Sequence, residues 1–229
     1  MPRVLVFDIF GTVVDWHGTI VREVSRRFPG VDADGFARAW RAGYQPAMEA
    51  VRSGGRGFVR LDTLHREILD GLLPRFGLQA LDEAEREDLN RVWHRLDPWP
   101  DSVPGLQRLK ARYTLCTLSN GNLGLLTAMA RRAGLPWDCV LSAEVFQAYK
   151  PDPRVYRGAA EVFGLAPAEV MMVAAHHDDL AAARACGLQT AYVERPREFG
   201  AAHPKDVSPV AANGWHARDL LDLADRLGA

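Results

Sequence analysis

The sequence of 229 residues is poor in the features that would tie it to a membrane, a secretory route or nucleic acid. Its three cysteines, Cys116, Cys139 and Cys186, lie far apart in no metal-ligand spacing, so we expect buried, reduced thiols in a cytoplasmic protein. No apolar run approaches the length of a membrane span, and Met1–Arg3 lead directly into a strand-like run without a signal-peptide region. The formal net charge of −1 predicts neither a nucleic-acid nor a membrane partner.

What the sequence does contain is the alternation of an α/β protein. Its 48% hydrophobic and 25% charged residues are typical of a soluble globular chain, long enough for one large domain or a core with an insert. Helical patterns separate short apolar runs, and Gly134, Gly164 and Gly187 each follow a helical pattern where a helix would end. This alternation predicts βαβ units and a parallel sheet. The expected strands are Val4–Phe7, Tyr113–Leu118, Val140–Ser142, Val170–Ala174 and Thr190–Val193, and the helices include Gly124–Ala133, Pro153–Phe163 and Leu180–Cys186.

The stretch between residues 16 and 96 has helical periodicity and no convincing strand. A helical insert after the first strand suggests a lid over the carboxyl edge of the sheet, with the proline-rich Asp97–Gly105 as the hinge back to the core. We therefore expect a core of residues 1–15 and 97–229 and a cap of residues 16–96. The expected cap helices are Val21–Phe28, Gly35–Val51, Leu61–Phe76 and Ala84–Trp93, with a glycine-rich break at Arg52–Gly57.

Polar residues follow four of the expected strands. Each alone has an ordinary explanation: an aspartate after a strand often caps a turn, Ser-Asn-Gly is a common turn, and a lone lysine is usually solvated. Ligands of open parallel sheets, however, bind outside the carboxyl ends of the strands. Four consecutive strand ends with such residues therefore predict one site. The residues are Asp8 after the first strand, Ser119-Asn120, Lys150, and His176 to Asp179.

The segments FDIFGTVVDW, LSNG and YKPDPRVY, followed by the acid after the fourth strand, resemble the haloacid dehalogenase superfamily in order and spacing. The resemblance covers nearly the whole chain. It is closest to the L-2-haloacid dehalogenase (type II) family, whose cap carries an arginine after a tryptophan, as in Trp40-Arg41 here. The resemblance implies an α/β fold with a Rossmann-like parallel sheet, helices on both faces and an inserted helical cap.

The resemblance also implies a two-step hydrolysis of 2-haloalkanoic acids. The Asp8 carboxylate would displace halide from C2 to give an ester, and water would then attack the Asp8 carboxyl carbon and release the 2-hydroxy acid. The implied partners are the small 2-haloacid and water, and dimerisation is common in the family although no segment here identifies an interface. The implied roles are halide binding by Arg41 and Asn120, substrate-carboxylate binding by Ser119 and Lys150, orientation of Asp8 by Thr12, and support of the lysine or pocket by Tyr156.

Two positions distinguish this chain from the phosphatases of the superfamily. Phosphatases carry a second aspartate two residues after the nucleophile as an acid for the leaving group, whereas Phe10 stands there in this sequence. Halide is a weak base that needs no proton, so an aromatic wall suits it. Phosphatases also place a magnesium ligand four residues before the last aspartate, where this chain has Ala175. We expect no metal and no cofactor. A phosphatase-like hydrolase and a non-catalytic binding protein are the alternatives.

The fourth strand end departs from the dehalogenases it resembles. Ala174 and His176 stand where that family usually has Ser and Asn, which leaves the water-activating residue to be identified. A neutral His176 could take a proton from water, or could merely bond to backbone at the strand end. We expect His176 and Asp179 in the catalytic set. His177, Asp178 and Asp152 are expected to be structural or solvent-facing, and residues 194–206 to form a surface loop bordering the site, without assigned chemistry.

Overall fold

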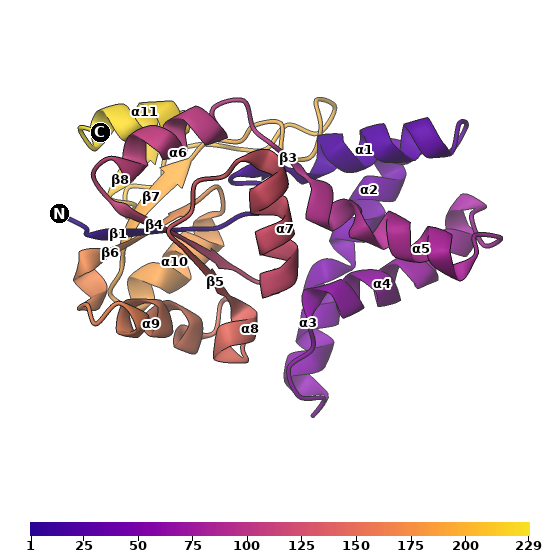
Figure 1. Cartoon of the computed structure of the whole chain (residues 1–229), viewed down its shortest axis with the longest axis horizontal. Coiled ribbons are helices and arrows are strands. Elements are labelled where there is room, and N and C mark those ends of the chain that lie inside the picture. Colours follow the sequence, from indigo (N-terminus) through magenta and orange to yellow (C-terminus); the bar gives the residue numbers. More distant parts are fainter.

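The computed structural model describes all residues from 1 to 229 and is built on a six-stranded sheet in which every pairing is parallel. The strand order is β5-β4-β1-β6-β7-β8, so β1 is central and its neighbours are separated from it in sequence by helices (Figure 1). The strands are β1 Val4–Phe7, β4 Thr114–Ser119, β5 Cys139–Ser142, β6 Val170–Ala174, β7 Gln189–Val193 and β8 Trp215–Ala217. The predicted α/β class with a parallel sheet is confirmed.

Helices cover both faces of the sheet, because side chains alternate along β1. Leu5 and Phe7 share a buried cluster with one set of helices, whereas Val4 and Val6 share a second cluster with another set. The first set is α6 Ser102–Lys110, α7 Leu123–Ala133 and α11 Leu220–Arg226, and the second is α9 Pro153–Val162 and α10 His177–Ala185. The short helices α8 Ala143–Phe146 and η3 Pro167–Glu169 complete the connections. This double covering leaves the carboxyl ends of the strands as the open edge.

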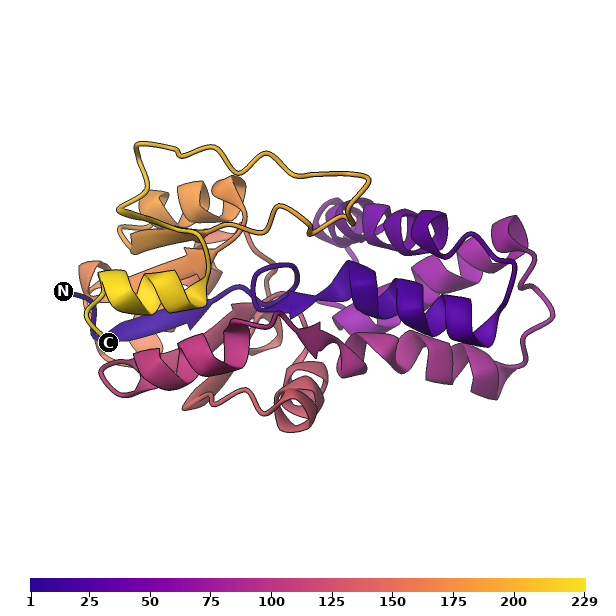
Figure 2. The same cartoon turned by 90° about the horizontal axis from the view of Figure 1, so that it is seen from above.

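A block of helices stands beyond that edge of the sheet (Figures 1 and 2). The chain enters it through β2 Val14–Asp15 and leaves it through β3 Asp97–Pro98, which pair antiparallel as a short ribbon. The block, called the helical block below, comprises α1 Trp16–Arg27, α2 Ala33–Ala42, α3 Tyr44–Ser53, α4 Leu61–Leu72, η1 Leu73–Phe76, α5 Glu83–Asn90 and η2 Arg91–Arg95.

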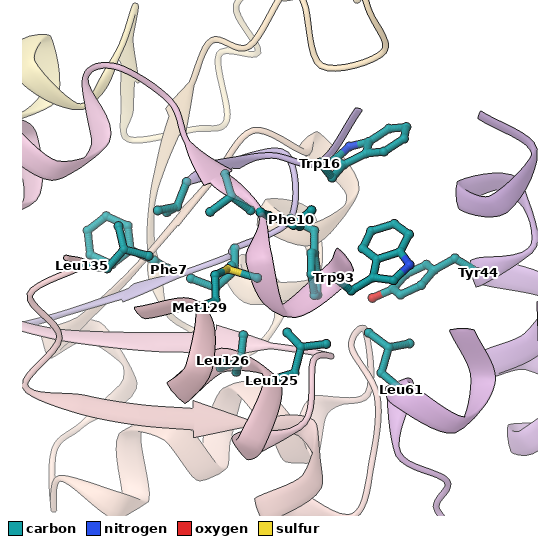
Figure 3. Close-up of a cluster of buried hydrophobic side chains, with 14 of the residues drawn as sticks. Phe7, Phe10, Trp16, Tyr44, Leu61, Trp93, Leu125, Leu126, Met129 and Leu135 are labelled. Carbon is teal, nitrogen blue, oxygen red and sulfur yellow. The ribbon is translucent and has the colours of Figure 1, made fainter. Parts of the chain in front are cut away.

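Aromatic side chains join the helical block to the sheet in one continuous cluster (Figure 3). Phe10, just after β1, meets Trp93 edge-on with ring centroids 5.8 Å apart. Trp93 stacks on His65 of α4 at 4.1 Å and meets Trp40 of α2 edge-on at 5.5 Å. Since aromatic pairs contribute beyond their buried area, these contacts fix the block against the edge of the sheet.

The structure differs from the sequence-based expectations in several local features. The expected helix Gly35–Val51 is two helices, because the chain turns at Gly43, where a Cβ atom would lie 2.6 Å from the Ile68 side chain of α4. The helix α6 begins inside the proline-rich segment expected to be a hinge, and β8 and α11 had no sequence prediction. The three cysteines are free thiols, but Cys139 is only half-buried. Among the helices, none combines the length and apolar character required to traverse a lipid bilayer.

The contact between α6 and α11 gives a stability prediction. A Cβ atom at Gly105 would lie 2.6 Å from the Leu220 Cβ and 2.8 Å from its backbone carbonyl carbon, so Gly105→Ala should cost about 1–3 kcal/mol of unfolding free energy. Gly71→Ala in α4 is the matched control, since nothing lies within 4 Å of its Cβ position and the gain should be about 0.5–1 kcal/mol. Urea titration of both variants measures the effect, and equal stabilities would contradict the tight packing.

Candidate active site

Asp8 lies at the carboxyl end of β1, where the chain turns sharply away from the sheet. The turn depends on Gly11, whose φ of 86° favours glycine, and Val13 and Val14 both donate backbone hydrogen bonds to the Ile9 carbonyl. Thr12 is thereby placed to donate from Oγ1 to Asp8 Oδ2 at 2.8 Å. The same hydroxyl accepts from the Ala175 N–H at 2.9 Å, so the ends of β1 and β6 share one hydrogen-bonded link.

Lys150 bridges two buried carboxylates. Its Nζ atom lies 3.0 Å from Asp8 Oδ1 and 2.5 Å from Asp179 Oδ2, and Tyr156 donates from its hydroxyl to Asp179 Oδ1 at 2.6 Å. Burial acts to raise the pKa of Asp8, but the charges of Lys150 and His176 outweigh it and hold that pKa below its usual range. Burial acts to lower the pKa of Lys150, yet Asp179 and Asp8 raise it. Asp8 is therefore an ionised carboxylate in a water-poor site.

His176 lies between a second pair of carboxylates. Its Nδ1 atom is 3.0 Å from Asp8 Oδ2, and its Nε2 atom is 2.9 Å from Glu198 Oε1. Burial acts to lower the pKa of His176, but Glu198 and Asp8 overcome this effect and raise it to about 9 from 6.5. The alternative that His176 only bonds to backbone does not describe this structure, because both of its ring nitrogens meet side-chain carboxylates.

Glu198 is the site residue that the sequence did not reveal. It belongs to residues 194–206, yet it is fully buried, and Lys205 Nζ donates to its Oε2 at 2.5 Å. Its segment is held down by Arg195, which donates to the Thr12 carbonyl at 2.8 Å and pairs with Asp101. Burial acts to raise the pKa of Glu198, but His176 and Lys205 lower it to about 2. The segment borders the site as expected, but it contributes chemistry that we had not assigned.

Gly11 is adapted to this approach of Glu198. A Cβ atom at Gly11 would lie 2.2 Å from Glu198 Oε1, so any larger residue would collide with the carboxylate. The glycine after the first strand thus serves two purposes: it allows the turn that places Thr12, and it leaves room for Glu198 beside His176.

The helical block contributes Arg41, near the end of α2, to the opposite wall of the site. Its guanidinium carbon lies 4.3 Å from the centroid of the Tyr44 ring and 5.7 Å from that of the Trp16 ring, a cation–π arrangement. Its Nη1 atom is buried and has no hydrogen-bond partner. Trp40, which precedes it, instead donates from Nε1 to the His65 carbonyl within the helical block. Arg41 therefore carries an unused donor in a buried position.

Two predicted residues at the end of β4 have different surroundings. Asn120 lines the cavity next to Asp8, and its Oδ1 accepts from the Lys150 backbone N–H at 2.7 Å. Ser119 is fully buried and accepts from the Gly121 N–H at 3.1 Å, and it is not among the residues lining that cavity. The carboxamide thus faces the cavity, while the hydroxyl shapes the turn beneath it.

The cavity beside Asp8 is small, and most of the residues that line it are polar or charged. Its volume is about 140 Å³. Binding sites for drug-sized molecules are larger, at about 300–1,000 Å³, so this cavity suits a compact ligand. The lining side chains that carry the argument are Asp8, Phe10, Arg41, Asn120, Lys150 and His176.

Three acidic or basic residues near the cavity take no part in the ion pairs around Asp8, as expected. His177 stacks on Tyr192 with ring centroids 4.0 Å apart, and Asp152 caps α9 by accepting from the Arg154 N–H. Asp178 is exposed at the rim of the cavity.

The ligand set around Asp8 suits cationic side chains better than a metal ion. Lys150, Thr12 and His176 already occupy hydrogen-bonding positions around its two oxygens. Ala175 has no side-chain ligand, and its backbone N–H donates to Thr12 while its carbonyl accepts from Lys205. A hard divalent cation needs several oxygen ligands. No group of three or more histidine, cysteine, aspartate or glutamate side chains is arranged to hold a metal.

A buried, ionised aspartate lies at the end of the first strand and faces a small cavity under a helical block, an arrangement that suits a hydrolase with a carboxylate nucleophile. The family model of haloacid dehalogenase-like hydrolases matches residues 2–187. The chain belongs to this family and, within it, to the L-2-haloacid dehalogenases.

Curated and solved relatives support this placement. The chain is 33% identical to (S)-2-haloacid dehalogenase 1 of Pseudomonas sp. (strain CBS-3), over 86% of this chain and 88% of that protein. It is 48% identical to the defluorinating L-2-haloacid dehalogenase Rha0230, with a TM-score of 0.94 over 100% of this chain and 96% of that one. It also resembles the L-2-haloacid dehalogenase of Xanthobacter autotrophicus with chloropropionic acid covalently bound, at 26% identity and a TM-score of 0.85, over 100% and 99% of the two chains.

The raised pKa of His176 predicts a pH-dependent contribution to stability. Because the folded-state pKa is about 9 and the ordinary value is 6.5, the protonated imidazole stabilises the fold fully below pH 6.5, and this contribution is lost as the pH rises through 9. The stability difference between wild type and His176→Gln should therefore shrink between pH 6 and pH 9, by on the order of 2–3 kcal/mol. Denaturant unfolding at several pH values measures it.

A stability difference between wild type and His176→Gln that stays constant over this pH range would show that the imidazole carries no extra proton in the folded protein.

Proposed function

We propose that Asp8 is the nucleophile with which this chain, a hydrolase of carbon–halide bonds, converts 2-haloalkanoic acids to 2-hydroxy acids and halide. The observation that carries the proposal is the Asp8 carboxylate itself, kept ionised by Lys150 and His176 and facing a cavity of about 140 Å³ whose opposite wall holds Arg41. A short-chain haloacid matches the volume of the cavity, and Lys150 and Arg41 offer cations to its carboxylate and its halide.

In the first step an Asp8 carboxylate oxygen attacks C2 of the substrate, and the carbon–halide bond breaks. The unpartnered donor of Arg41 and the Asn120 carboxamide stabilise the departing halide, while Phe10 keeps water from it. Charge stabilisation is most effective where water is excluded. Lys150 binds the substrate carboxylate, with Ser119 in a supporting position beneath Asn120, and Thr12 holds Asp8 in the attacking orientation.

In the second step water attacks the Asp8 carboxyl carbon, and His176 accepts a proton from that water. A general base must lie within reach of the proton that it takes, and His176 contacts Asp8, the group whose carboxyl carbon the water attacks. Glu198 fixes the orientation of the His176 ring. Asp179 and Tyr156 hold Lys150 in place through both steps. The Xanthobacter autotrophicus relative with chloropropionic acid covalently bound supports a covalent intermediate in this chain.

The helical block acts as the cap in this proposal, with the core formed by residues 1–15 and 97–229. Arg41 and Tyr44 come from the block and Asp8 from the core, so the cavity is complete only when the two parts are in contact. The phosphatase alternative finds less support, because Phe10 supplies no acid for an alkoxide leaving group and Lys150 takes the position next to Asp8 and Asp179 that a metal ion would need.

The covalent route predicts the fate of solvent oxygen. In a single turnover with excess enzyme in ¹⁸O-water and EDTA, the label should enter the Asp8 carboxylate, and the first hydroxy acid released should carry unlabelled oxygen from Asp8. Mass spectrometry of the Asp8 peptide and of the product measures both. Asp8→Asn should remain folded and give no turnover. Label appearing first in the product, or a requirement for added Mg²⁺, would contradict the proposal.

The halide role of Arg41 predicts a large loss from a charge-conserving change. Arg41→Lys and Arg41→Ala should each lower kcat by on the order of 10²–10³, as for removal of one donor that acts in the transition state, because a lysine lacks the planar guanidinium. Halide release under substrate saturation measures the effect. Arg38→Lys on the same helix is the matched control, since Arg38 pairs with Asp34 at 2.7 Å and does not line the Asp8 cavity. Near-normal kcat in both Arg41 variants would remove Arg41 from the mechanism.

A further inference from the structure

The hydrogen bonds of His176 determine its charge in the resting site. Nδ1 faces Asp8 and Nε2 faces Glu198, and an ionised carboxylate can only accept hydrogen bonds. Both ring nitrogens must therefore donate, so the resting ring is an imidazolium. An imidazolium has no lone pair on nitrogen and cannot take a proton from water. The residue in the position of the general base is thus in the wrong protonation state before the reaction begins.

The geometry points to a switch: esterification of Asp8 removes one of the two carboxylate charges that hold His176 protonated, and His176 then loses its proton and becomes the base for the second step. This inference rests on the proposed covalent function and adds to it the step in which the proton leaves the site. The proton leaves with the halide, in the first half of the reaction, and not with the hydroxy acid.

The other charged groups around His176 do not replace the lost charge. Glu198 is shared with Lys205, 2.5 Å away, and Trp16 also donates to its Oε1 at 3.4 Å. On the far side of Asp8, Lys150 keeps Asp179 as its partner at 2.5 Å.

The remaining titratable groups of the cavity do not restore the negative charge that Asp8 loses. Arg41 adds positive charge, Tyr44 and Tyr156 are neutral phenols, and Asp178 is exposed at the rim, where solvent screens it. After esterification the one carboxylate that still contacts His176 is Glu198, which Lys205 shares, while Lys150 holds the carboxylates of Asp179 and the bound substrate on the far side of Asp8. Burial then acts against the charge of His176, as it already does in the resting site.

The proton and atom balance closes over one turnover. Asp8 forms a bond to C2, halide departs with the bonding pair, and His176 releases its proton to solvent, to which 20% of its side chain is exposed. In the second step the water oxygen bonds to the Asp8 carboxyl carbon, one water proton goes to His176 and the other ends on the hydroxyl of the product. Breaking the ester bond restores the Asp8 carboxylate beside an imidazolium. One proton and one halide are released for each substrate.

The switch can be tested on the whole protein by replacing Asp8 with its neutral isostere. In ¹⁵N-histidine-labelled protein, with His176 assigned by its loss in His176→Gln, the wild-type ring should remain doubly protonated at pH 7 and titrate near pH 9. In Asp8→Asn its pKa should fall by about 1–3 units, the usual effect of an adjacent opposite charge. Glu194→Gln is the control: it removes the carboxylate 2.7 Å from His216 and should leave the His176 titration unchanged. A neutral His176 at pH 7 in wild type, or an unchanged pKa in Asp8→Asn, would overturn the switch.

A kinetic measurement on wild type gives an independent result if Asp8→Asn does not fold. A pH indicator in weak buffer should record one proton per site with the time course of halide release in a single turnover, and proton release in step with hydroxy acid formation would overturn the inference. Mass analysis of the quenched enzyme separates the two proposals. Absence of an ester on Asp8 would refute the covalent function, whereas an ester with late proton release would refute only the switch.

Discussion

The buried Asp8 carboxylate is the group on which the rest of the site depends. Burying a charge is costly unless it is paired and hydrogen-bonded, and here acids and cations alternate so that each charge has a partner of opposite sign. Asp8 stands in the middle, between Lys150 and His176. The complete series runs Tyr156, Asp179, Lys150, Asp8, His176, Glu198 and Lys205. Removing one ionised member leaves a buried charge without its partner, so the side chains of the series stabilise the site only when all of them are in place.

The parallel sheet brings these side chains to one place. The carboxyl ends of β1, β4 and β6 meet at one edge, and Lys150 follows β5 at the same edge. The link from Thr12 to the Ala175 N–H connects two of these ends directly. Arg41, Tyr44 and Gln45 come from outside the core, and the aromatic cluster around Phe10 and Trp93 holds their helices against the edge. Catalysis thus depends on packing between the helical block and the core.

The sequence predicted the strands and the residues at their ends well, because apolar runs followed by polar residues have a direct structural meaning. It could not predict Glu198, since the charged, proline- and glycine-containing residues 194–206 have the composition of a surface loop. Only the folded chain shows that Glu198 returns to His176 and that Gly11 leaves space for it. The break at Gly43 was missed because the helical pattern continues through it. Only the folded chain shows that Ile68 of α4 packs so close to Gly43 that a Cβ atom there would lie 2.6 Å from it.

The arrangement of charge also explains why the site suits an anionic substrate whose leaving group is a halide. A 2-haloalkanoate brings one negative charge and leaves as two anions, the halide and the hydroxy acid, with one proton released. Lys150 and His176 contact Asp8, and Arg41 comes to the same cavity from the helical block, so the cavity offers cations from both the core and the block. A phosphate monoester would need a proton for its alkoxide, and Phe10, packed edge-on against Trp93, cannot supply one. The aromatic cluster therefore positions the helical block and leaves no acid at the position two residues after Asp8.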